Sequence, residues 1–271
     1  MKHDLPERLN IAMMSSSQVV DLLVGMTVDV TVESLCYNLA RYYRTGSCDY
    51  RIRDMIACVE QAWYRSVDRG QPDYSVYSSN YYLAESFACF AVYSKGYVRN
   101  LTKSVQGKQP VADMVAAGST IVDLGCGCGL TTALLKSVFP SADVYGTQLK
   151  GLQHAIATAI GRQAGFTVLE SIGNLLPDVV FASEYIEHFK EPIAHIAPIM
   201  DTRPALTVFS NSFSASALGH FSEYKVGGEL IQNKKMGRYF NRWMRSLDYA
   251  QVDTGFYNQR LCVWKDSNNE A

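Results

Sequence analysis

The chain has 271 residues, of which 48% are hydrophobic, and a net charge of −1, so it is expected to be globular with no overall attraction to nucleic acid. No apolar run reaches the ~18 residues that span a bilayer, and the polar start MKHDLPERLN does not resemble a signal peptide. The seven scattered cysteines include no C-x-x-C pair, which indicates free thiols in a reducing compartment. We therefore expect a cytoplasmic protein, and the lack of a long apolar run predicts no membrane partner.

The first 75 residues are predicted to form a helical extension. Residues 1–14 have no clear periodicity and are expected to form a leader. Apolar residues recur at helical spacing in three segments, with Asp49 as the N-cap of the last, which predicts helices at 15–24, 31–43 and 49–68. Gly70, Pro72 and Asp73 then break the chain, so we expect an extension at 1–75 and a larger domain at 76–271.

A long amphipathic helix is expected at 82–101, in the segment where tyrosine is most frequent. These tyrosines either line the entrance to a substrate site or pack on neighbouring elements with their hydroxyls at the surface. The tyrosines concerned are Tyr74, Tyr77, Tyr81, Tyr82, Tyr93 and Tyr97.

From residue 119 onward, strand and helix patterns alternate, which predicts an α/β domain built on a mostly parallel sheet with helices on both faces. Seven strands are expected, at 120–124, 144–147, 166–169, 179–183, 206–210, 249–253 and 260–264. Helices are expected at 130–137, at 149–163, from about 185, and at 230–247.

A glycine-rich turn follows the first of these strands, in the sequence STIVDLGCGCGLTTALL. Glycine can reach backbone angles that other residues avoid, and the next helix begins with free N–H groups, so the turn suits a nucleotide-like cofactor. The alternative is a turn that serves only packing. Ile121 to Gly129 resembles motif I of the class I S-adenosylmethionine (SAM) methyltransferases, because the third glycine comes one residue earlier than in the dinucleotide fingerprint.

This resemblance implies a Rossmann-like fold whose last strand is antiparallel and lies between its neighbours. It also implies that Gln148, after the second strand, takes the place of an acidic residue that bonds the ribose. A neutral amide binds a diol more weakly than a carboxylate does, and an NAD site would also require an acid there. The residues that the resemblance assigns to SAM are Asp123, Gly125, Cys126, Gly127, Gly129, Gln148, Glu170, Ser171 and Ser183.

The stretch ASEYIEHF follows the fourth strand and carries the spacing E-x-x-E-H. On a helix, Glu184, Glu187 and His188 would share one face. The stretch resembles the RNA 3′-terminal 2′-O-methyltransferases and the ubiquinone-pathway O-methyltransferases, and the resemblance implies catalytic roles for these three residues. With the later His220 they are also predicted to hold a divalent metal ion that activates a hydroxyl. Alternatively, the glutamates favour a helix start and His188 is a base or a structural residue.

A basic stripe on the helix expected at 230–247 consists of Lys235, Arg238, Arg242 and Arg245. Such a face binds phosphates in nucleic-acid-binding proteins but is also an ordinary solvated surface. The sequence therefore predicts an SAM-dependent enzyme that methylates a hydroxyl of a small molecule. The alternatives are a nucleic-acid methyltransferase, a catalytically silent methyltransferase-like binding module, and an NAD-dependent oxidoreductase.

Overall fold

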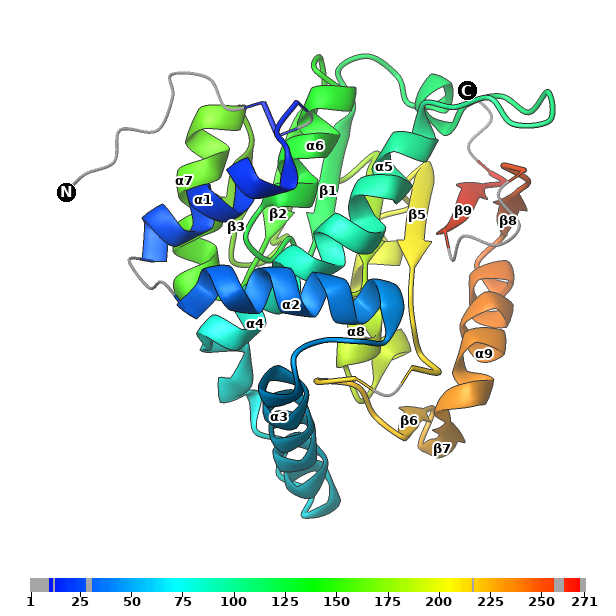
Figure 1. Cartoon of the computed structure of the whole chain (residues 1–271). Helices are drawn as coiled ribbons and strands as arrows, with labels where there is room; N and C mark the ends of the chain where they lie inside the picture. Colours follow the sequence, from blue (N-terminus) through cyan, green and yellow to red (C-terminus); the bar gives the residue numbers. More distant parts are fainter. Residues whose placement is uncertain (1–9, 12, 28–30, 216, 256–260, 269–271) are drawn as a thin grey trace.

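The computed structural model of the chain describes residues 10–11, 13–27, 31–215, 217–255 and 261–268 (Figure 1). Most of the predicted leader at 1–14 lies outside these residues. The three predicted N-terminal helices are confirmed as α1 (Ser16–Thr27), α2 (Thr31–Thr45) and α3 (Tyr50–Asp68). Asp49 is the N-cap of α3, since its side chain accepts a hydrogen bond of 2.9 Å from the Arg51 N–H.

The long helix predicted at 82–101 begins two residues earlier and contains a π-helical turn. It consists of α4 (Asn80–Cys89), the π turn Phe90–Ser94 and α5 (Lys95–Leu101), and a 3-10 turn at Tyr74–Ser78 precedes it. Helix α2 packs against α4 (Figure 1). Buried side chains of α1, α2 and α3 join the same hydrophobic cluster as those of the sheet. The predicted division of the chain at residue 75 stays a prediction.

The sheet has seven strands, as predicted, and their order is β3-β2-β1-β4-β5-β9-β8. Strand β9 is antiparallel and lies between β5 and β8, which confirms the position expected for the last strand. The strands are β1 (Thr120–Leu124), β2 (Asp143–Thr147), β3 (Thr167–Leu169), β4 (Val179–Ser183), β5 (Leu206–Ser210), β8 (Tyr249–Val252) and β9 (Leu261–Asp266).

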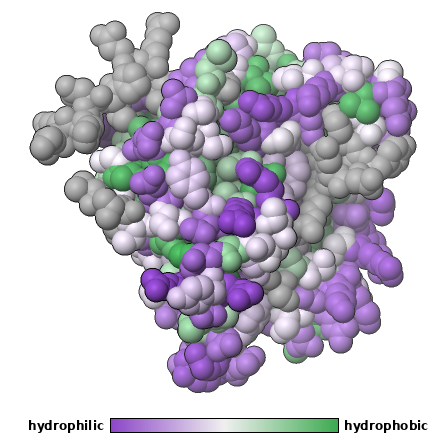
Figure 2. Space-filling model, in the orientation of Figure 1, coloured by the Kyte–Doolittle hydropathy of each residue, from purple (hydrophilic) through white to green (hydrophobic). Residues whose placement is uncertain are grey.

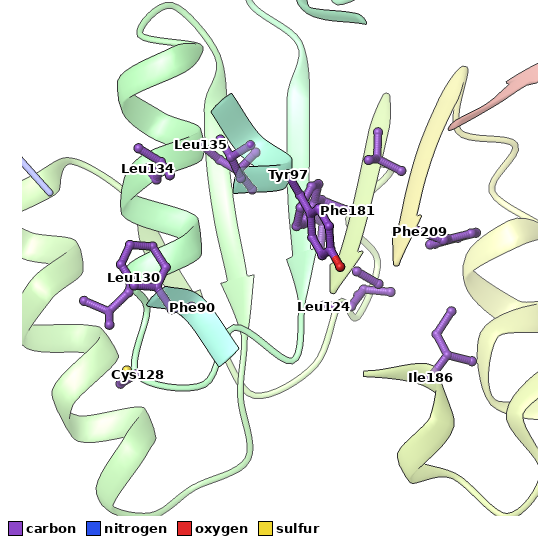
Figure 3. Packing of buried hydrophobic residues seen from close by; sticks show 14 of the residues in the cluster. Phe90, Tyr97, Leu124, Cys128, Leu130, Leu134, Leu135, Phe181, Ile186 and Phe209 are labelled. Carbon is purple, nitrogen blue, oxygen red and sulfur yellow. The ribbon is translucent and has the colours of Figure 1, made fainter. Parts of the chain in front are cut away.

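The strand order reverses direction between β1 and β4, and right-handed crossovers on the two sides of that point place helices on both faces. The crossover helices are α6 (Leu130–Val138), α7 (Leu152–Ala164) and α8 (Pro192–Met200), followed later in the chain by α9 (Asn233–Ser246). Figure 3 shows Leu130, Leu134 and Leu135 of α6 in the buried core, together with Phe90 and Tyr97 from the helix before β1. This packing fixes the start of α6, and with it the glycine turn.

Two predicted helices differ from the structure. No helix begins near residue 185: Glu184 has a positive φ of 52°, the short 3-10 turn Ile186–His188 follows, and α8 begins only at Pro192. The helix predicted at 230–247 begins at Asn233, because residues 229–232 belong to a hairpin of β6 (Glu223–Val226) and β7 (Glu229–Gln232). Gly227 and Gly228, both at positive φ, form the turn of this hairpin. None of the helices in the described residues is long and apolar enough to cross a bilayer.

Candidate active site

A pocket of about 1140 Å³ opens at the carboxyl ends of the central strands. This is where parallel α/β sheets bind ligands, next to the reversal of strand order between β1 and β4. The glycine turn, the ends of β2 and β3 and the segment after β4 line one side, and tyrosines of the N-terminal elements line another. The predicted site residues that line it are Gly125, Cys126, Gly127, Gln148, Glu170, Ser171, Ser183, Glu184, His188 and His220.

The glycine turn approaches other side chains so closely that a Cβ would overlap them. Gly125 and Gly127 have φ values of 65° and 55°, in the left-handed region that favours glycine. A Cβ on Gly125 would overlap the Tyr185 ring, and one on Gly127 would overlap the hydroxyl oxygen of Ser86 in α4. The turn is therefore covered in part by protein side chains on the side that faces the pocket.

The end of β2 holds the glycine turn through a series of hydrogen bonds. The Thr147 hydroxyl oxygen accepts one of 3.1 Å from the Gly125 N–H, and the Thr147 carbonyl accepts one of 2.9 Å from the Cys126 N–H. The Gln148 side-chain oxygen accepts one of 3.1 Å from the Gly127 N–H. Gln148 therefore lines the pocket and also supports the glycine turn. The resemblance to the methyltransferases did not predict this supporting role.

Asp123 and Gly129 are not among the residues that line the pocket, and their assignment to the cofactor stays a prediction. Asp123 is buried and accepts a hydrogen bond of 2.6 Å from the Thr132 hydroxyl in the first turn of α6, and burial raises its pKa to about 7. Gly129 lies against α7, where a Cβ would be 3.1 Å from the Ala157 Cα. Both residues hold α6 in place, so their effect on a ligand would be indirect.

The polar residues expected beside the adenine and the methyl group lie at the pocket wall. Glu170, after β3, forms an exposed ion pair of 2.9 Å with Lys150, and Ser171 follows it. At the end of β4, the Ser183 and Ser94 hydroxyl oxygens are 2.9 Å apart, which connects the strand to the helix before β1. The polar residues predicted for the cofactor therefore lie at the carboxyl ends of β2, β3 and β4.

The E-x-x-E-H residues are not arranged on one helix face. Glu184 lies in the pocket wall, whereas the Glu187 side chain turns inward and is fully buried. Its Oε1 accepts a hydrogen bond of 2.6 Å from the Ser212 N–H, after β5. Burial, and then the charge of Glu184, raise the pKa of Glu187 well above its usual value, and its bond to Ser212 gives it a structural role.

The two histidines of the predicted metal set do meet in the pocket. The rings of His188 and His220 make an edge contact with centroids 4.9 Å apart, and His188 Nδ1 is 3.1 Å from the Tyr77 hydroxyl oxygen. Burial, followed by the charge of His220, lowers the pKa of His188 to about 3, so its ring is neutral at physiological pH.

The residues do not fit the predicted metal site of Glu184, Glu187, His188 and His220. Glu187 does not line the pocket and is bonded to Ser212. In the part of the chain that the structure describes, no three His, Cys, Asp or Glu side chains are grouped so that they could hold a metal ion. The spacing suggested a metal because it presumed a helix, and the left-handed backbone at Glu184 prevents that helix.

Several pocket residues come from N-terminal elements that the sequence motifs did not single out. Glu85 of α4 is buried and accepts a hydrogen bond from the Tyr43 hydroxyl of α2. Burial raises the pKa of Glu85 to about 7. Four of the predicted entrance tyrosines line the pocket, whereas Tyr81 and Tyr97 are buried outside it; the four are Tyr74, Tyr77, Tyr82 and Tyr93.

The basic stripe of α9 lies apart from this pocket. Met236, Phe240 and Met244 are buried beneath the helix, and the four predicted basic residues are exposed. Figure 2 shows mostly hydrophilic residues in the region where Figure 1 places α9. Arg242 packs over the ring of Tyr239 and Arg245 over that of Trp264. No residue of α9 is among the pocket-lining residues that the structure describes, so binding of nucleic acid here stays a prediction.

No protein-family model matches the chain, and no curated protein matches it. Among solved structures, it is similar to a proposed O-methyltransferase from Nostoc punctiforme, with 13% identity over 78% of this chain and 69% of that one, and a TM-score of 0.50. An O-methyltransferase family protein from Burkholderia thailandensis gives 16% identity, 68% and 58% coverage and a TM-score of 0.47, so the chain spans little more than half of that protein. Magnesium protoporphyrin IX methyltransferase from Synechocystis, solved with bound SAM, is 16% identical over 68% of this chain and 84% of that one, with a TM-score of 0.46. The first likeness concerns the fold alone, and it confirms the predicted Rossmann-like α/β architecture.

Proposed function

We propose that this protein is an SAM-dependent methyltransferase that methylates a hydroxyl oxygen of a small molecule. The observation that carries the proposal is the continuity of the pocket, which reaches from the motif I-like turn at Gly125 to the histidine and tyrosine side chains beyond β4. Its volume of about 1140 Å³ is large enough for a nucleoside cofactor and an acceptor together. The Nostoc punctiforme structure is itself described as a proposed O-methyltransferase.

The lining side chains are of the kinds that an adenosyl ligand needs. Gln153 Nε2 is a buried donor that has no hydrogen-bond partner in the described residues, and Gln153 lines the pocket beside Gln148. A ribose hydroxyl could accept from this donor, because buried polar groups favour a partner. We therefore propose that Gln148 and Gln153 hold the ribose, with Glu170 and Ser171 beside the adenine and the turn at Gly125–Gly127 beside the methionine part.

When bound, SAM would supply an activated methyl group, so the chain mainly has to orient the acceptor in line with it. We propose that neutral His188 accepts a hydrogen bond from the acceptor hydroxyl, while Tyr77 orients the imidazole ring. A pKa of about 3 makes His188 a weak base, so positioning explains its place better than strong proton abstraction. Glu184 has a left-handed backbone of the kind that concentrates at active sites, and it also lines the pocket.

A methyl-transfer assay tests this proposal. The protein would be incubated with SAM carrying an isotopic label in the methyl group and with a panel of phenols and alcohols, and the products analysed by mass spectrometry. The proposal expects labelled methyl ethers, with turnover lowered by His188→Asn. Products methylated only on nitrogen or carbon would contradict the assignment to oxygen.

A second candidate function is a cofactor-binding module without catalysis. The Tyr185 ring covers Gly125, and the Gln148 oxygen is already bonded to the turn, which leaves fewer groups for the cofactor. Binding of SAM without methyl transfer to any member of the panel would favour this candidate.

A further inference from the structure

The Glu85 side chain is an unusual group to find at the wall of this pocket. Only 6% of the residue is exposed, and its Oε1 accepts the hydrogen bond from the Tyr43 hydroxyl. Its Oε2 is buried and has no hydrogen-bond partner within the described part of the chain. A carboxylate oxygen withdrawn from water without a partner is costly, so this atom is suited to bind a donor that arrives with a ligand.

Aromatic rings lie beside Tyr43, the hydrogen-bond partner of Glu85. The Tyr43 ring lies 6.0 Å from the Tyr42 ring and 6.3 Å from the Tyr93 ring, measured between centroids. Tyr82 and Phe90 also line the pocket. The faces of such rings attract cations, and the attraction grows when water is excluded.

The charges near Glu85 also favour a cation. Glu60 of α3 lines the same pocket, and its charge acts on Glu85. Among the described lining residues, Lys150 alone is a lysine or arginine, and it is paired with Glu170 at 2.9 Å. The tyrosine-rich side of the pocket therefore has carboxylates without a basic side chain of its own.

We propose that Glu85, Tyr43 and the neighbouring tyrosine rings bind an ammonium group of a ligand in the pocket. The inference rests on the proposed function, and it adds a recognition element to it. Ser86, the next residue, lies against the turn at Gly127, so the site adjoins the turn that would hold the cofactor. Two sources of the ammonium group fit this position: the methionine part of the cofactor, and an amine carried by the acceptor.

Calorimetric titrations of the wild type and of Glu85→Gln distinguish the sources. S-Adenosylhomocysteine would be compared with 5′-methylthioadenosine, which lacks the amino acid, and tyramine with tyrosol, which has a hydroxyl in place of the amine. The substitution is expected to weaken an ammonium ligand roughly tenfold, because a charge-assisted hydrogen bond is lost, and to leave its neutral analogue within about twofold. A loss confined to S-adenosylhomocysteine assigns the site to the cofactor, and a loss confined to tyramine assigns it to the acceptor.

The inference is overturned if Glu85→Gln binds both ammonium ligands as the wild type does, if the wild type binds neither, or if the substitution weakens ammonium and neutral ligands equally. Failure of the wild type to bind S-adenosylhomocysteine and methylthioadenosine contradicts the proposed function instead, and the tyramine titrations still test the site. Glu229→Gln, at an exposed carboxylate of β7, is the matched control. If Glu85→Gln does not fold, Tyr43→Phe removes the hydrogen bond that favours the charged form of Glu85, so it should weaken the same ammonium ligand selectively.

Discussion

The Gln148 side chain joins the second strand to the glycine turn: its Oε1 accepts a hydrogen bond of 3.1 Å from the Gly127 N–H, and its Nε2 donates one of 3.0 Å to Gln153 Oε1. The residue that replaces the expected acid is therefore built into the support of the turn. A neutral amide can accept from one neighbour and donate to another, which a carboxylate cannot do.

Gln148→Ala is expected to loosen the turn, because the Gly127 N–H loses its acceptor. The free energy of unfolding should fall by about 1 kcal/mol, and the affinity for S-adenosylhomocysteine should fall several-fold. Gln148→Glu keeps an acceptor for Gly127 and adds a charged acceptor for the ribose, but it loses the donor to Gln153 Oε1, so its affinity should fall less than that of Gln148→Ala. Thermal denaturation and calorimetry measure both effects. Unchanged affinity in Gln148→Ala would remove Gln148 from the cofactor site.

Gly127→Ala is expected to destabilise the protein more than Gly227→Ala does. The two glycines have nearly equal φ values, 55° and 57°, so the cost of the left-handed backbone, about 1–2 kcal/mol, is shared. A Cβ at position 227 meets nothing within 4 Å, whereas one at 127 overlaps the Ser86 hydroxyl. Chemical denaturation measures the difference, and Ser86→Ala should reduce it in the double variant. Equal costs at both positions would show that the turn and α4 do not approach as closely as described.

Local patterns were sufficient for most of the fold. The strand at 120–124, its glycine turn and the helix from 130 were predicted because a short apolar run, turn residues and helical spacing follow one another there. The β6–β7 hairpin also has a local signal, since Gly227 and Gly228 separate two short strand-like runs, but the prediction of a helix from residue 230 overlooked it.

The parts of the site that the sequence did not predict depend on tertiary contacts. E-x-x-E-H spacing places the side chains on one face only if the backbone is helical. Glu184 is instead left-handed, and its N–H bonds to the Ser210 carbonyl at the end of β5. Glu85 lies 42 residues from Tyr43, and no local motif connects them. The signal that could have identified Glu85 is a glutamate among the apolar residues of an otherwise uncharged helix, α4.

The pH dependence of stability should change in Asp123→Asn. Burial raises the pKa of Asp123 from 3.8 to about 7, so the stability that its protonated form contributes is complete below 3.8 and is lost as the pH rises through about 7. Asparagine does not ionise and can still accept from Thr132. The variant should therefore gain stability relative to the wild type across that range, by a few kcal/mol at most. Urea denaturation over a pH series measures this gain, and a difference independent of pH would show that Asp123 is not perturbed.

Glu187→Ala and Glu187→Gln are expected to differ in stability. Alanine removes the acceptor of the Ser212 N–H, which should cost about 1–3 kcal/mol, whereas glutamine retains an acceptor and should cost less. Because Glu187 does not line the pocket, Glu187→Gln should keep its affinity for S-adenosylhomocysteine. The matched chemical test is EDTA, which should leave methyl transfer unchanged. Loss of activity with EDTA, restored by a divalent ion, would reinstate the metal hypothesis.

The most direct test of the cofactor assignment is a calorimetric titration of the wild-type chain with S-adenosylhomocysteine, repeated with Gly125→Val. The Cβ of a valine at this position would overlap the Tyr185 ring, so the substitution should disturb the wall that faces the methionine part. We expect one binding site for S-adenosylhomocysteine per wild-type chain, and a large loss of this affinity in the folded Gly125→Val variant. Absence of binding to the wild type at millimolar ligand, or equal affinity in the folded Gly125→Val protein, would contradict it.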